Sequence, residues 1–120
     1  MKIVVTAQAA GLEAQVDPRF GRCSSFVIVD TETMETESVP NENVIAAGGA
    51  GVQAAQLMSD KGAEAVLTGN CGPNAYRTLR EANIEVIVGV KGTVAEAVEK
   101  FKAGAFESTD EPSVDAKFGV

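Results

Sequence analysis

The chain has 120 residues, 45% of them apolar and 22% charged, which predicts one domain with a buried core. Its net charge of -7 excludes general nucleic-acid binding, because phosphate backbones require a basic face. No apolar run approaches the roughly 20 residues of a membrane-spanning helix. Two widely separated cysteines and the lack of histidine argue against a structural zinc site. We expect a cytoplasmic protein without membrane partners.

The first part of the chain predicts three strands. Residues 3–7 and 25–30 are short runs rich in β-branched residues, and the second is apolar enough to be covered on both faces. Residues 31–34 are expected to form a hairpin turn. The strand that follows, at 35–39, has polar alternation and should lie at a sheet edge, where Pro40 stops it.

The second part of the chain alternates helices and strands. A helix is predicted from a glycine-rich run to a C-terminal cap at Gly62, followed by a strand at 64–69. Pro73 is placed to open the next helix, and a strand follows at 84–88. Thr93 is the expected N-cap of the last helix, which has the clearest helical period in the chain.

These elements predict an α/β fold with the order βββαβαβα. A right-handed crossover makes the last two strands parallel, and the expected sheet is mixed, with five strands in the order 3-2-1-4-5 and three helices. Residues 1–103 would form the domain. Residues 104–120 are acidic and aperiodic and are expected to be a mobile tail.

In that arrangement four connecting segments meet at one edge of the sheet, which we call the rim. They are residues 8–23, 48–51, 70–73 and 90–93, and the last three open helices. Helix N-termini expose unpaired N–H groups and the positive end of the helix dipole. The rim is also where open α/β sheets bind ligands. The sequence therefore predicts binding of a compact anion before it predicts catalysis.

The glycine run has three interpretations. Residues 49–54 match G-x-G-x-x-A, the dinucleotide-binding fingerprint, but lack the acidic residue that should follow about 20 positions later. The run could instead cradle another anion, or could simply form a tight turn.

Cys71 also has two interpretations. A cysteine at a helix N-terminus can be a dipole-stabilised thiolate, acting as a nucleophile or soft-metal ligand. It can equally be a small buried residue that packs a tight turn. The neighbouring Asn70 and Asn74 are expected to cap and brace the backbone more than to contact a ligand.

Arg19 and Arg22 lie three residues apart in the first loop, close to Cys23. Guanidinium groups are fixed forks of donors that suit oxyanions and sulfide-rich clusters. The alternative is that Arg19 or Arg22 pairs with Asp17 or with a helix end and pins the loop; Asp17 itself is expected to cap the turn before Pro18. Without histidine, a Ser-His or Cys-His relay is excluded, so an enzyme is not expected.

Three motifs together resemble the dinitrogenase iron–molybdenum cofactor biosynthesis family. They are VDPRFGRC at 16–23, GGAGVQAA at 48–55 and GNCGPNAY at 69–76, and the likeness runs from Met1 to about Phe101. The resemblance implies a ribonuclease-H-like fold. It also implies binding or carriage of a metal–sulfur cofactor by an accessory protein rather than an enzyme.

Within that family the chain is similar to the branch of small orange proteins from sulfate-reducing, anaerobic bacteria. That resemblance implies a molybdenum–copper sulfide cluster held without covalent attachment. Some relatives on the nitrogenase side are thought to use a histidine, which this chain lacks, so delivery to nitrogenase is not expected. Nuclease activity is not expected either, because residues 4–6 contain no metal-binding aspartate.

The hypothesis is a carrier for an anionic metal–sulfur cluster, of the molybdenum–copper sulfide or iron–molybdenum type, with protein partners in a cofactor-assembly or redox complex. Cys23 and Cys71 are candidate soft ligands, although a sulfide-capped cluster needs neither, and Lys91 could add charge. The expected cofactor-binding residues are Arg19, Arg22, Cys23, Gly48, Gly49, Ala50, Gly51, Asn70, Cys71, Gly72 and Asn74. The alternatives are an enzyme or sensor that binds a phosphorylated or nucleotide ligand through Gly48–Gly51, and a regulatory module that uses the acidic tail.

Overall fold

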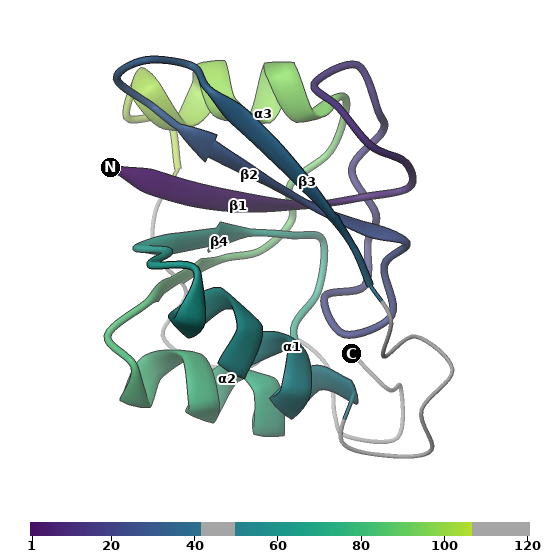
Figure 1. The fold of residues 1–120 in the computed structure, drawn as a ribbon, viewed down its shortest axis with the longest axis vertical. Coiled ribbons are helices and arrows are strands. Elements are labelled where there is room, and N and C mark those ends of the chain that lie inside the picture. The colour runs from purple at the N-terminus through teal and green to yellow at the C-terminus, as the bar shows by residue number, and fades with distance from the viewer. Residues whose placement is uncertain (42–49, 107–120) are drawn as a thin grey trace.

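The computed structural model describes residues 1–41 and 50–106, which form one mixed five-stranded sheet with helices on both faces (Figure 1). The sheet order is β3-β2-β1-β4-β5, as predicted. The strands are β1 (Lys2–Ala7), β2 (Ser25–Asp30), β3 (Thr36–Pro40), β4 (Ala65–Leu67) and β5 (Glu85–Ile87). The helices are α1 (Ala50–Asp60), α2 (Pro73–Glu81) and α3 (Val94–Lys102). The predicted order βββαβαβα is confirmed.

Strand pairing fixes which strand ends share the rim. β1 is antiparallel to β2, with Ala7 opposite Ser25, and β2 is antiparallel to β3, with Ser25 opposite Pro40. β1 is parallel to β4, and β4 is parallel to β5, with Leu67 opposite Ile87. The carboxyl ends of β1, β3, β4 and β5 therefore lie beside the amino end of β2. Pro40 is the last residue of β3 rather than a residue beyond it, which an edge strand tolerates.

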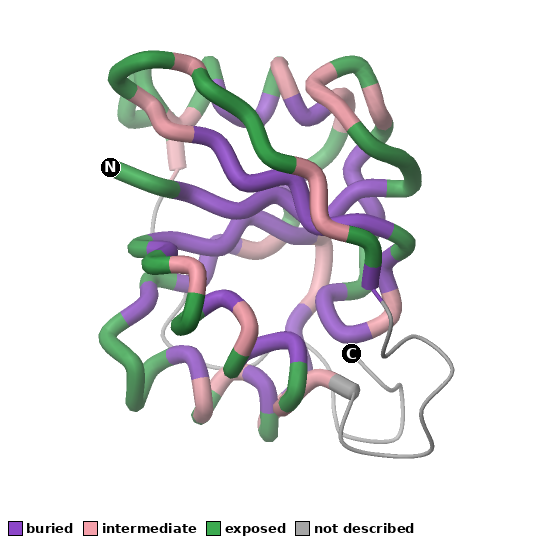
Figure 2. Tube along the Cα trace, in the orientation of Figure 1, coloured by how far each residue is buried: buried purple, intermediate pink, exposed green. Residues whose placement is uncertain are grey.

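The sheet separates two apolar cores, and Figure 1 shows α1 and α2 on one face and α3 on the other. The strands between them are mostly buried, whereas exposed residues gather on the outer sides of the helices (Figure 2). On the α1–α2 face the buried side chains are Val4, Phe20, Cys23, Phe26, Ile28, Ala54, Ala55, Met58, Ala63, Val66, Cys71, Ala75, Leu79, Ile84 and Val86. On the α3 face they are Ile3, Val5, Ala7, Val16, Val27, Val29, Ala65, Leu67, Ile87, Val90, Val94, Ala97 and Val98.

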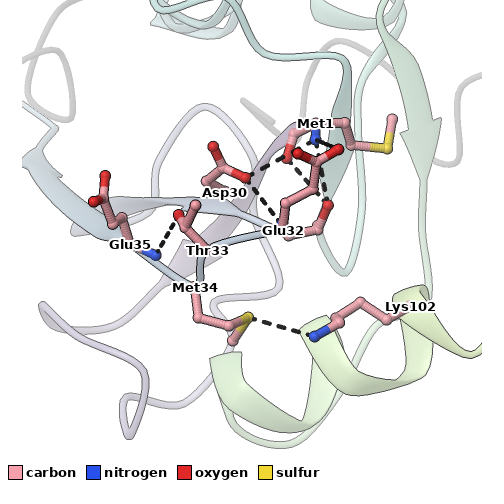
Figure 3. Close-up of polar contacts among 8 residues, drawn as sticks. Met1, Asp30, Glu32, Thr33, Met34, Glu35 and Lys102 are labelled. Atoms are coloured by element: carbon pink, nitrogen blue, oxygen red, sulfur yellow. Dashed lines mark hydrogen bonds and ion pairs between the residues drawn. The ribbon is translucent and has the colours of Figure 1, made fainter.

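At the end of the sheet opposite the rim, the predicted β2–β3 hairpin turn is confirmed and is tied to its neighbours (Figure 3). The terminal ammonium of Met1 lies 4.0 Å from Asp30 Oδ1 and 3.9 Å from Glu32 Oε1. Met34 has a positive φ of 62° in the turn, and its sulfur lies 3.7 Å from Nζ of Lys102 on α3. These contacts join the hairpin to β1 and α3.

After α3 the chain turns at Gly104, and Phe106 is half-buried against the α3-face core. Residues 107–120 lie outside the described part, so the predicted tail and the boundary at residue 103 stay predictions. The ribonuclease-H-like assignment also stays a prediction. Among the described residues, no helix is both long and apolar enough to cross a membrane.

Candidate functional site

The rim is built where the loop of residues 17–23 lies against the turn between β4 and α2. The Phe20 amide donates to the Asn70 carbonyl oxygen at 3.2 Å, and Arg19 and Asn70 form a parallel bridge. Asn70 Nδ2 donates to the Pro18 carbonyl oxygen at 3.3 Å. The bracing role expected for Asn70 is therefore seen, and two of the three family-like motifs meet here.

Gly69 makes this approach possible. A Cβ atom at Gly69 would lie 2.5 Å from Pro18 Cα and 2.9 Å from the Pro18 carbonyl oxygen. Both distances fall well below van der Waals contact with backbone that cannot rotate away. The loop can therefore sit against the turn only because residue 69 has no side chain.

Asp17 fixes the start of the loop. Its carboxylate is buried, and Oδ1 accepts the Arg19 amide at 3.0 Å, which is the turn-capping role expected of it. The same oxygen lies 3.7 Å from Nε of Arg19, so the pairing that would pin the loop is also present. Even so, the Arg19 side chain is 54% exposed. Its guanidinium can therefore still meet a ligand.

Asn41 holds the end of the loop, and the sequence analysis missed it. Its side-chain amide donates to the carbonyl oxygens of Gly21 at 3.0 Å and Cys23 at 2.9 Å. Arg22 lies between these two residues and is half-buried. A buried asparagine whose partners are backbone carbonyls about 20 positions earlier leaves no signal in a local pattern. It could be identified only once the sheet pairing was known.

The N-terminus of α2 is open. Its N-cap is Gly72, which has no side chain to accept a hydrogen bond, and Pro73 has no N–H group. Within residues 1–41 and 50–106, the next two amides, of Asn74 and Ala75, have no hydrogen-bond acceptor; Asn74 is exposed, whereas Ala75 is buried. They combine unsatisfied donors with the positive end of the helix dipole, which favours an anion.

The N-terminus of α3 is closed, contrary to the expectation that it contributes donors to the rim. Thr93 and Glu96 form a reciprocal capping box, with distances of 3.1 and 2.9 Å. The amides of Val94 and Ala95 donate to carbonyl oxygens of the 8–23 loop at 2.9 and 2.8 Å. The α3 amides therefore have no capacity left for a ligand, and α3 lies on the other face of the sheet from α1 and α2. Of the α2 and α3 N-termini, only that of α2 therefore has amide donors left for an anion.

Both cysteines are fully buried in the α1–α2 core. Burial raises the pKa of the Cys71 thiol to about 12. Burial also raises the pKa of Cys23 to about 12, with the negative charge of Asp17 adding to the effect. This is the opposite of what a dipole-stabilised thiolate requires. The structure favours the interpretation of Cys71 as a residue that packs the turn.

The remaining donor set suits an anion and not a bare cation. Across the described residues, no group of three or more Cys, Asp or Glu side chains is gathered to hold a metal ion. Amides and guanidinium groups instead fit a cluster whose metals are already coordinated by sulfide.

Gly48 and Gly49 lie outside the described residues. Gly51 falls in the first turn of α1 and is partly exposed, and whether this run cradles a ligand stays a prediction.

The sequence profile of the family described as dinitrogenase iron-molybdenum cofactor matches residues 1–104. The chain belongs to this family. The match spans every strand and helix of the fold and both sides of the rim, so family membership applies to the domain as a whole and not to one motif.

Several solved structures share the fold over nearly their full length. The apo form of the orange protein from Desulfovibrio gigas is 42% identical, with a TM-score of 0.92 over 94% of this chain and 96% of that one. A putative NifB protein from Thermotoga is 32% identical, with a TM-score of 0.80 over 94% of this chain and 98% of that one. The predicted resemblance to the family and to its orange-protein branch is therefore confirmed.

Two archaeal relatives extend the comparison. An uncharacterized protein of Methanocaldococcus jannaschii is 30% identical over 96 residues, covering 78% of this chain and 81% of that protein. A putative dinitrogenase from the same organism is 16% identical, with a TM-score of 0.69 over 93% of this chain and 97% of that one. At that identity the second shows a shared fold alone.

Proposed function

We propose that this protein binds and carries an anionic metal–sulfur cluster without covalent attachment, at the α2 side of the rim. The observation that carries the proposal is the uncapped N-terminus of α2, where the exposed Asn74 has an amide without an acceptor among the described residues, at the same rim as the exposed side chain of Arg19. Membership of the dinitrogenase cofactor family supports a cofactor-related role. The proposed protein is an accessory factor of the cytoplasm, not an enzyme.

The donor chemistry favours a cluster already saturated with sulfide. A molybdenum–copper sulfide cluster and an iron–molybdenum–sulfur cluster both present negatively charged sulfur to the protein. Amide N–H groups and a guanidinium can hold such a surface, whereas neither buried, protonated cysteine is placed to displace a sulfide. Likeness to the orange protein favours the molybdenum–copper form. The first turn of α1, with Gly48–Gly51, and the half-buried Arg22 would complete the site.

Reconstitution tests the proposal directly. The full chain is incubated with tetrathiomolybdate and copper, desalted, and examined by visible spectroscopy and elemental analysis. We expect a coloured protein that retains molybdenum and copper in a fixed ratio. A colourless, metal-free protein after desalting would contradict the proposal.

Variants then distinguish binding of the cluster by charge and hydrogen bonds from coordination of its metals by the cysteines. Replacing both cysteines by alanine should leave loading intact, because the thiols are buried and protonated at neutral pH. Arg19→Gln should lower loading. Arg80→Gln is the matched control, since Arg80 is an exposed arginine in the last turn of α2, at the end of that helix away from the rim. Equal losses in both arginine variants would show that only net charge matters and that the rim is not the site.

Partner proteins would receive or supply the cluster in a cofactor-assembly or redox complex. A carrier must release its cargo, and a site made of hydrogen bonds and one exposed guanidinium suits release better than thiolate ligation does. Pull-down with the loaded protein as bait, and with the unloaded protein as control, tests this. Partners recovered equally with both forms would argue against cluster transfer.

A further inference from the structure

The rim contains a buried negative charge at the place proposed to hold an anion. The Asp17 carboxylate is almost wholly buried and lies 3.7 Å from the guanidinium of Arg19, whose side chain is 54% exposed. Its field also reaches into the rim, because it helps to raise the pKa of Cys23. Arg19 is thus shared between a fixed carboxylate and any ligand that approaches from solvent.

The charge of Asp17 is not what holds residue 17 in place. Its backbone amide donates to the Thr6 carbonyl oxygen at 2.8 Å, and its own carbonyl oxygen accepts the Thr6 hydroxyl at 2.8 Å. The Oδ1 contact to the Arg19 amide at 3.0 Å needs an acceptor oxygen, which a neutral amide also provides. Only the 3.7 Å ion pair requires a carboxylate. The negative charge is therefore available for another role.

We infer that Asp17 is a positioning residue that limits the affinity of the rim for its cargo by competing for the guanidinium of Arg19. In the unloaded protein the carboxylate holds Arg19 at the rim. When an anionic cluster binds, it must share that guanidinium with Asp17, so binding is weaker and more readily reversed than it would be with a neutral residue. This inference rests on the proposed function and explains how the same site can both load and release.

The inference predicts that cluster affinity rises when Asp17 is neutralised, which a purely structural role of Asp17 does not predict. Asp17→Asn keeps the acceptor oxygen and removes the competing charge, so cluster affinity should rise, by about two- to fivefold, the range expected for a partly exposed ion pair. If Asp17 served only to shape the loop, the same variant should bind the cluster more weakly. Affinity is measured from the loss of visible absorption as protein loaded with tetrathiomolybdate and copper is diluted stepwise.

Two controls make the test specific. Glu13→Gln removes one negative charge from an exposed residue of the same loop and should leave affinity unchanged. In an Arg19→Gln background, the gain from Asp17→Asn should disappear, because no guanidinium is left to compete for. A gain that persists in full there, or a matching gain in Glu13→Gln, would overturn the inference.

Folding is checked by thermal unfolding of each variant. Asp17→Ser offers a second neutral acceptor oxygen, and the same gain is expected from it. If neither neutral variant folds, the charge is required for structure and the inference is wrong. If the wild-type protein takes up no cluster at all, the proposed function fails and this inference falls with it. Loading of the wild type without a gain in Asp17→Asn overturns the inference alone.

Discussion

At the scale of single residues, burial decides what the two cysteines can do. In the folded protein the pKa of each thiol is raised from 9.0 to about 12, so between these values only the unfolded chain loses the protons. Below pH 9 both states are protonated and the thiols add no pH dependence. As pH rises from 8 to 10, the free energy of unfolding should fall by about 1.4 kcal/mol for each thiol.

Urea unfolding at pH 8 and pH 10 measures that loss. The control is the protein with Cys23→Ala and Cys71→Ala, in which lysine and tyrosine still titrate but the thiols do not. Its decline between the two pH values should be smaller by about 2.7 kcal/mol. Equal declines in both proteins would show that the thiols are not held protonated by the fold.

Gly69 should be the residue of the rim least tolerant of a side chain. Gly69→Ala places a methyl group against Pro18 backbone and should cost about 1–3 kcal/mol, the usual cost of overpacking. Gly62→Ala is the matched control: its φ of +76° is strained for alanine, but nothing lies within 4 Å of the added Cβ. That strain costs about 1 kcal/mol. Urea unfolding gives both values, and cluster loading should fall only in Gly69→Ala.

Local chemistry predicted some of these residues and not others. The turn-capping role of Asp17 and the bracing role of Asn70 follow from residue type and neighbours. The pairing of Arg19 with Asp17 was one of two alternatives that the sequence left open, and the structure shows it alongside an exposed guanidinium. The sequence left two interpretations of Cys71 open, and the raised pKa favours the packing one; a short motif does not reveal how deeply its turn is packed.

At the scale of elements, hydrophobic periodicity and caps predicted every strand and helix in the right order. The last two strands were predicted too long: 64–69 was expected where β4 covers Ala65–Leu67, and 84–88 where β5 covers Glu85–Ile87. The closure of α3 could be predicted only in part. Thr93 was the expected N-cap, but the amides of Val94 and Ala95 donate to backbone carbonyls of a loop about 80 residues earlier in the chain. The residue types of a long loop do not determine the path of its backbone.

The open end of α2 makes a prediction at this scale. Gly72 has φ −76° and ψ 170°, which other residues can adopt, and Gly72→Asp would put an acceptor at the N-cap. That carboxylate should accept from the free amides, stabilise the helix by a few tenths of a kcal/mol, and repel an anionic cluster. Because Gly72 is buried, thermal unfolding checks that the variant folds, and we expect loss of loading in the folded protein.

The matching change at the N-cap of α3 should lower stability and leave cluster loading unchanged. Thr93→Ala removes half of a capping box that is already formed and should cost about 1 kcal/mol of stability. Loading should not change, because the α3 amides are on the far face of the sheet and already have acceptors. Thermal melting and visible absorption of the two variants decide the matter. Loss of loading in Thr93→Ala, with retention in Gly72→Asp, would indicate a site at α3 and contradict the proposed site at α2.

At the scale of the whole molecule, an acidic chain carries arginine and amide donors at the rim. A net charge of -7 repels anions at long range, and this repulsion is screened beyond about 8 Å at physiological salt. Binding must then come from short-range contacts at the α2 side of the rim. Unlike a nucleic-acid-binding protein, this chain should discriminate by shape and donor geometry, favouring a compact cluster over a long polyanion.

Thermal unfolding of the whole chain can identify the ligand class, including the alternative of a phosphorylated or nucleotide ligand at Gly48–Gly51. A ligand at 100 times its dissociation constant stabilises the native state by about 2.7 kcal/mol, which for this length raises Tm on the order of 10 °C. Tetrathiomolybdate with copper should produce such a shift, whereas ATP and inorganic phosphate at millimolar concentration should not. Gly72→Asp serves as the control, because it should abolish the shift in a protein that still unfolds cooperatively. A large shift with ATP and none with the metal sulfide would instead favour a nucleotide-binding protein.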